Sequence, residues 1–166
     1  MATPTYIPIA TVTLATVASG VYFDGISQDY SDLILAMSFS GGYGNGTATI
    51  SLNADTGANY PYQRMVADGS SASGFQGTLD YMGPVYLYAP TGEPMSVELQ
   101  LFDYTATDKH KTGIIRNGTA SVGVVASAHR WASTSVVTGL SINAGNANNF
   151  AAGSKFTLFG IHGEVV

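Results

Sequence analysis

The residues with the most chemistry to offer are three consecutive ones, His129, Arg130 and Trp131, the last being the only tryptophan in the chain. An exposed tryptophan beside a histidine or an arginine is suited to stacking on a sugar ring or to contacting another subunit. A tryptophan at the end of a strand can equally close a hydrophobic core. Two interpretations therefore stay open: a glycan or interface site at residues 129–131, or a core position for Trp131.

The sequence shows no pattern typical of a catalytic or metal centre. His110, His129 and His162 lack the short spacing of metal ligands, and there is no Gly-x-Ser-x-Gly nucleophile turn. A polysaccharide-cleaving enzyme would need two carboxyl groups about 5 to 9.5 Å apart. The only clustered acids are Asp80, Glu93, Glu98 and Asp103, which we interpret as surface residues. We therefore expect no catalytic residue, no metal site and no cofactor.

Two polar loops resemble binding motifs superficially. The glycine-rich residues 41–46 precede an extended run, whereas a phosphate-binding loop opens a helix, so we interpret them as a turn. Residues 53–59 are rich in Asn and Asp but lack the closing bidentate carboxylate of a calcium loop. Side-chain to backbone hydrogen bonds of the Asx type are expected to hold this second loop.

The composition is poor in charge. The 166 residues include six basic and eleven acidic side chains but 20 glycines, and the mean hydropathy is +0.16. About a quarter of the residues of an average soluble protein are charged, and those charges keep its surface from associating. We therefore expect neighbouring subunits to cover part of this surface.

Net charge and hydropathy also exclude several partners. A net charge of −5, with no basic residue before Arg64, disfavours nucleic acid, and the uncharged start of the chain does not predict a secretory signal peptide. No apolar run approaches the 18 or so residues that span a membrane. The absence of cysteine excludes disulfides and leaves the redox compartment open.

Apolar residues alternate with polar ones at a period of two, which is typical of half-buried strands. Leu33, Leu35, Met37 and Phe39 share one parity, and the same pattern recurs in residues 47–52 and 95–101. Further strands are predicted at residues 11–17, 21–23, 64–67, 85–88, 119–128, 135–142 and 155–161. About ten short strands joined by Gly-, Asn- and Ser-rich turns predict an all-β fold, an antiparallel β-sandwich of jelly-roll-like type.

The turns carry their own predictions. Asn45-Gly46 and Asn117-Gly118 match the glycosylation sequon, but Asn-Gly also favours tight hairpins, and we predict hairpin turns at both. Residues 68–74 are expected to form a mobile surface loop, and residues 108–111 a solvated hairpin end. In the strand predicted at 119–128, the even positions form a small apolar face, which places His129 and Trp131 on the more polar face.

The chain is expected to form a single sandwich domain at residues 11–166, preceded by an N-terminal arm at residues 1–10. The arm contains two prolines and no charge, so we expect it to lie across an adjacent subunit. The residues predicted to make that contact are Thr3, Pro4, Tyr6, Ile7 and Pro8.

Nearly the whole chain resembles a family of structural proteins of tailed bacteriophages. The resemblance lies in residues 11–14 (Thr-Val-Thr-Leu), 21–23, 30–35, 53–60 (Asn-Ala-Asp-Thr-Gly-Ala-Asn-Tyr) and 149–161. Members of that family occur as small virion proteins and as the C-terminal parts of tail fibres. No catalytic residue carries over from the family.

This resemblance implies a non-enzymatic virion protein that is assembled in the cytoplasm of the host bacterium. The first expectation is a capsid decoration, or cement, protein, a homotrimer that binds the major capsid protein or other virion subunits and stabilises the head. The alternative is a tail-fibre tip that recognises host-surface glycans. The chain begins at Met1 and contains no coiled-coil or collagen-like shaft, which favours decoration.

Overall fold

The computed structural model describes residues 5–41, 48–83, 93–119, 123–145 and 149–162, and this part of the chain is built from β-strands without a helix. Every paired neighbour is antiparallel. The large sheet has eight strands in the order β1 (Tyr6–Thr13), β11 (Lys155–Ile161), β3 (Asp32–Phe39), β7 (Met95–Phe102), β8 (Lys111–Thr119), β9 (Gly123–Trp131), β5 (Tyr60–Ala67) and β6 (Ala72–Leu79). The small sheet has three, in the order β2 (Gly20–Asp24), β10 (Gly139–Ala144) and β4 (Ala48–Leu52).

The two sheets pack face to face over one hydrophobic core. Side chains of one parity from β3 and β7 are buried there with side chains of the small sheet, among them Leu35, Leu99, Ile50 and Ile142. The all-β antiparallel sandwich predicted from the sequence is thus confirmed, and so is the buried parity of β3, β4 and β7. Eleven strands are present in the described residues, against about ten predicted.

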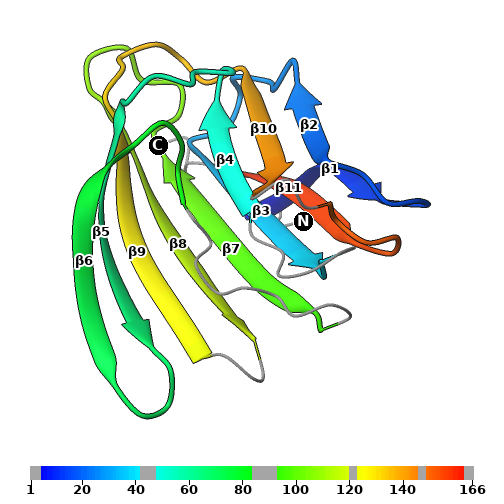
Figure 1. The fold of residues 1–166 in the computed structure, drawn as a ribbon. Coiled ribbons are helices and arrows are strands. Elements are labelled where there is room, and N and C mark those ends of the chain that lie inside the picture. Colours follow the sequence, from blue (N-terminus) through cyan, green and yellow to red (C-terminus); the bar gives the residue numbers. More distant parts are fainter. Residues whose placement is uncertain (1–4, 42–47, 84–92, 120–122, 146–148, 163–166) are drawn as a thin grey trace.

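The sandwich is unequal, and this asymmetry decides which surfaces stay open. Figure 1 shows the small sheet lying over one half of the large sheet, while β8, β9, β5 and β6 curve away to one side. The curvature follows from the right-handed twist that accumulates across adjacent strands. We call the face of the large sheet that points away from the core the outer face.

Several strand boundaries differ from the sequence predictions. The extended run predicted at residues 119–128 is interrupted: Thr119 ends β8, and β9 begins at Gly123 and continues to Trp131. The strand predicted at 64–67 begins four residues earlier, at Tyr60. The strand predicted at 85–88 lies outside the described residues.

The turn predictions had mixed outcomes. Asn117-Gly118 is not the hairpin turn; both residues belong to β8 and lie opposite Val125 and Val124 of β9. The Asn45-Gly46 turn and most of the glycine-rich run fall outside the described residues. The loop predicted at 68–74 is wrong beyond Ser71, because β6 begins at Ala72.

A two-residue turn joins β5 to β6. Gly69 has φ +89°, a value that glycine adopts without strain and that suits the first central position of a type II′ turn. The Asp68 carboxylate accepts hydrogen bonds from the backbone N–H groups of Ser70 and Ser71 at 2.9 and 2.7 Å. These bonds lower the pKa of the Asp68 carboxyl and hold the turn in one conformation.

The hairpin end between β7 and β8 is solvated only in part. Residues 108–110 are exposed as predicted, but Lys111 is buried. Its Nζ donates hydrogen bonds to the carbonyl oxygens of Ala106, Lys109 and Thr134, the last two at 3.3 Å. Burial lowers the pKa of Lys111, and the three carbonyls compensate for the hydration that its ammonium group loses.

The predicted N-terminal arm is in part a strand of the sheet. Tyr6, Ile7 and Pro8 belong to β1, which pairs with β11 from Tyr6 to Thr13 and so crosses the predicted boundary at residue 10. Thr3 and Pro4 lie outside the described residues. Contact of these residues with another subunit stays a prediction.

Candidate docking face

The outer face of the large sheet is an open surface in the part of the chain that the structure describes. Directly opposite residues of neighbouring strands lie on the same face of a sheet, so the register defines rows across it. One row crosses all eight strands and consists of small, hydroxyl-bearing or charged side chains and one methionine, in the order Gly74, Met65, Ala126, Arg116, Glu98, Ala36, Thr157 and Thr11.

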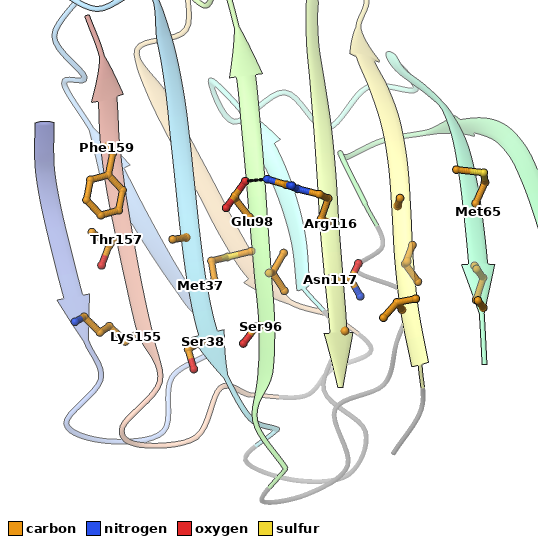
Figure 2. A pocket seen from close by; sticks show the side chains of 18 of the residues that line it. Met37, Ser38, Met65, Ser96, Glu98, Arg116, Asn117, Lys155, Thr157 and Phe159 are labelled. Carbon is orange, nitrogen blue, oxygen red and sulfur yellow. Dashed lines mark hydrogen bonds and ion pairs between the residues drawn. The ribbon is translucent and has the colours of Figure 1, made fainter. Parts of the chain in front are cut away.

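This face is hollowed along its whole width. The largest hollow, about 940 Å³, extends from β5 across β9, β8, β7 and β3 to β11 (Figure 2). Three smaller hollows continue it toward β6 and β1. A concave surface of this extent can receive a convex segment of another macromolecule.

Apolar side chains stand exposed in and around the hollow. Met65 is 69% exposed and Val124 60%, and Ile114 of β8 is 43% exposed. Between Val124 and Arg130, the positions of β9 on this face are the alanines Ala126 and Ala128, whose short side chains leave the hollow open. Methionine and branched aliphatic residues that stay in water within one concave patch are typical of a protein contact surface.

Charge on the largest hollow is sparse and nearly balanced. Glu98 and Arg116 lie directly opposite each other on β7 and β8 and form an ion pair, drawn in Figure 2. Both side chains remain well exposed, so the pair contributes little to stability. Lys155 of β11 stands at the rim of the same hollow. The face therefore offers a partner an apolar area on β5 and β9, around Met65 and Val124, with one ion pair near the middle of the sheet and Lys155 at the rim.

The structure corrects the orientation of β9. Its odd positions, including His129 and Trp131, point into the sandwich and are buried, while Arg130 is exposed on the outer face. The small apolar parity that the sequence analysis identified is the one that faces outward. Trp131 is 3% exposed and cannot stack on a sugar, so its core interpretation is the correct one.

Trp131 is fixed by a bond to the loop between β4 and β5. Its Nε1 donates a hydrogen bond to Oδ2 of Asp55 at 2.7 Å. Asp55 also accepts from the backbone N–H of Gly57 and from Nδ2 of Asn59, at 2.8 and 3.0 Å. The Trp131 bond is the largest of the causes that lower the pKa of the Asp55 carboxyl. The Asx-type loop predicted at residues 53–59 is confirmed.

His129 belongs to a buried polar cluster on the inner side of β5 and β9. Its Nε2 lies 2.9 Å from Oγ of Ser127, and its ring stacks on Tyr62 with centroids 5.8 Å apart. Burial, with a smaller contribution from the Arg64 charge, lowers the pKa of His129 to about 4. Both Ser127 and His129 are about 95% buried, so a substrate in solution cannot reach this serine–histidine pair.

Two of the four acids considered for polysaccharide cleavage, Glu98 and Asp103, lie in separate ion pairs. Glu98 is paired with Arg116 on the outer face, and Asp103 with Lys109 at the hairpin end, at 2.7 Å. Among the described residues, no group of three or more His, Asp and Glu side chains is placed to hold a metal ion. The same residues include no helix long and apolar enough to cross a membrane.

Comparisons with protein-family models, with curated proteins and with solved structures give no match for this chain. The all-β sandwich with its open outer face is therefore the structural basis for any functional assignment.

The outer face was not predicted from the sequence, because the alternation in β9 placed His129 and Trp131 on the more polar face of the strand, and that parity is the buried one. A usable signal was present. The outward parity of β9 holds only alanine and valine before Arg130, whereas the inward parity ends in the large residues His129 and Trp131. Large side chains fill the interior of a sandwich, and small ones leave a hollow.

Proposed function

We propose that this protein is a non-enzymatic structural protein of a tailed-phage virion, a decoration protein that binds the outer shell of the head through its outer face. Its partners would be the major capsid protein or other virion subunits. The observation that carries this proposal is the concave outer face, with Met65, Val124 and Ile114 exposed in and around its hollows. The resemblance to phage structural proteins supplies the virion as the place of that contact.

The side chains of the outer face favour a protein partner over a sugar. Glycan sites stack aromatic rings on the apolar faces of sugars, and Trp131, the ring expected to do so, is buried. The aromatic ring of Phe159 also lines the largest hollow but is only partly exposed. The most exposed large apolar groups there are the thioether side chain of Met65 and the aliphatic side chain of Val124. Such groups pack well against the side chains of a protein.

The function proposed for this protein is binding to the capsid, without catalysis. A decoration protein stabilises a shell because it binds the assembled form and adds its binding free energy to that form. Several copies bridging neighbouring capsid subunits add to this effect through effective concentration. Neither step requires a cofactor. The trimer expected from the sequence stays a prediction.

Gold-labelled antibodies against the protein, applied to purified particles of the phage that encodes it, test the location. Label on the heads is the expected result. Label confined to the tail would favour the fibre-tip alternative, and unlabelled particles would contradict a virion role.

A pair of variants tests the surface used. Val124→Glu places a charge on the outer face, and an interface formed there would have to desolvate that charge. The affinity of the variant for phage particles prepared without this protein should therefore be lower by about tenfold or more. Val17→Glu, at an exposed position away from this face, is the matched control and should attach normally. Equal attachment of both variants would exclude the outer face as the docking surface.

A further inference from the structure

Strand β6 is an edge strand without the usual protection. It pairs with β5 alone among the described strands, and seven of its eight residues are exposed. Its sequence, residues 72–79 (Ala-Ser-Gly-Phe-Gln-Gly-Thr-Leu), contains no charged residue and no proline. An uncharged edge of this length presents free backbone N–H and C=O groups to another strand.

The register shows which backbone groups of β6 are free. The N–H of Asp68 donates to the carbonyl of Ser71 at 3.2 Å, so this closing pair of the β5–β6 hairpin is hydrogen-bonded. Bonded and non-bonded pairs alternate along an antiparallel ladder, so Ser73, Phe75 and Gly77 bond to β5. The N–H and C=O groups of the four even residues, Ala72, Gly74, Gln76 and Thr78, therefore point away from the sheet.

The opposite edge of the same sheet is protected. β1 carries Pro8, and its register with β11 shifts between Pro8 and Ala10. A proline removes a donor, and a bulge disrupts the regular spacing of the edge, so both features hinder pairing with another chain. The contrast identifies β6 as the edge open to addition of a strand.

We propose that β6 is a self-association edge, where a second copy of this chain adds its own β6 in antiparallel orientation and joins the two large sheets into one. All four free residues are used when Ala72 lies opposite Thr78 of the other copy and Gly74 opposite Gln76. That register places the two-fold axis at Phe75. The two Phe75 side chains then face each other as a non-hydrogen-bonded pair, where side chains are closest.

A copy of the same chain suits this edge better than a chain of different sequence. Two-fold pairing sets a strand against itself, so a charge on the strand near the axis would lie opposite its own like charge, and β6 carries none. The Arg64 guanidinium, whose Cζ lies 4.8 Å from the centroid of the Phe75 ring, belongs to β5 and is set back from the axis by one strand. Phe75 is 46% exposed in the single chain, and an aromatic pair across the axis would remove much of that surface from water. The arrangement predicts a dimer, in contrast to the expected trimer, and it does not depend on the proposed virion role.

Sedimentation over a range of protein concentrations tests the association, with Gln76→Pro as the variant. Proline at residue 76 removes an outward N–H but leaves the ladder with β5 intact, so the fold should be retained by circular dichroism. We expect dimers for the wild type, and a dissociation constant raised about tenfold or more for the variant. Gln76→Thr, which keeps the N–H, is the control and should dimerise like the wild type.

A cysteine variant tests the register. The chain has no cysteine, so Phe75→Cys introduces a single thiol at the proposed axis. The two Cα atoms of a non-hydrogen-bonded pair lie about 4.5 Å apart, within the range of a disulfide. Mild oxidation should give a covalent dimer on a non-reducing gel. Ser73→Cys, whose copies would lie far apart in this register, should stay monomeric on the same gel.

Three results would overturn the proposal: a wild type that stays monomeric at every concentration, a trimer in place of the dimer, or a Gln76→Pro variant that associates as well as the Gln76→Thr control. Cross-linking of Ser73→Cys without cross-linking of Phe75→Cys would overturn it as well, because it would require a different axis.

Discussion

His129 should make the stability of this protein depend on pH, and the structure gives the sign and the size of the effect. The folded chain lowers the pKa of His129 to about 4 from an ordinary value of 6.5, first because the imidazole is buried and then because Arg64 is nearby. Between these two values the unfolded chain binds a proton at this residue and the folded chain does not. Acidification through this window therefore favours unfolding.

The magnitude follows from the separation of the two pKa values. A difference of about 2.5 units corresponds to roughly 3 kcal/mol at 1.36 kcal/mol per unit. The folded state has this stability in full above about pH 6.5 and loses it progressively down to about pH 4, with no further loss from this residue below that pH.

Urea denaturation of the wild type and of His129→Gln, at half-unit steps from pH 7.5 to 4, measures the effect. Glutamine can still bond to Ser127 but does not titrate, so the variant should lack the part of the pH dependence that belongs to residue 129. The free energy of unfolding of the wild type, relative to that of the variant, should fall by about 3 kcal/mol as the pH falls across the window. His110→Gln changes an exposed histidine and serves as the control. Parallel stability curves for wild type and His129→Gln would refute the reasoning.

Three further predictions concern stability measured by urea denaturation. Trp131→Phe keeps an aromatic ring in the core but loses the bond to the Asp55 carboxylate, and should cost about 1.5–3 kcal/mol; no measurable loss would show that the bond is not formed in solution. Lys111→Met leaves three backbone carbonyls without their donor and should cost about 2–3 kcal/mol, whereas Lys109→Met, in an exposed ion pair, should cost at most about 1 kcal/mol; similar losses for both would contradict the burial of Lys111. Leu99→Ala opens a cavity under the small sheet and should cost about 2–5 kcal/mol, and a value near zero would mean that β7 does not pack as described.

The orientation of a strand in the sandwich could be predicted where its large apolar side chains all lie on one parity and that parity is buried. In β3 and β7 the large apolar side chains occupy one parity, and that parity is the buried one. Such strands specify their own orientation, because a slip of one residue would expose every leucine and methionine.

The candidate site was less predictable because in β9 the parity that carries small apolar residues is exposed, and the parity that carries polar residues is buried. Its inward parity carries Ser127 and His129, which lie buried because they bond to each other and because Tyr62 and Arg64 of β5 pack beside them. Those partners come from a strand more than 60 residues earlier, so local patterning does not show them. The position of Trp131 depends on Asp55 in the same way.

The unlike edges of the large sheet bear on how far an assembly of this protein can grow. If β6 joins to β6, both open edges are used, and each end of the joined sheet is then a β1 with its proline and its irregular register. A chain that could add strands at both edges would extend into a fibre. This one would stop at two copies, so a protein with very few charged groups has a geometric means of avoiding open-ended polymerisation.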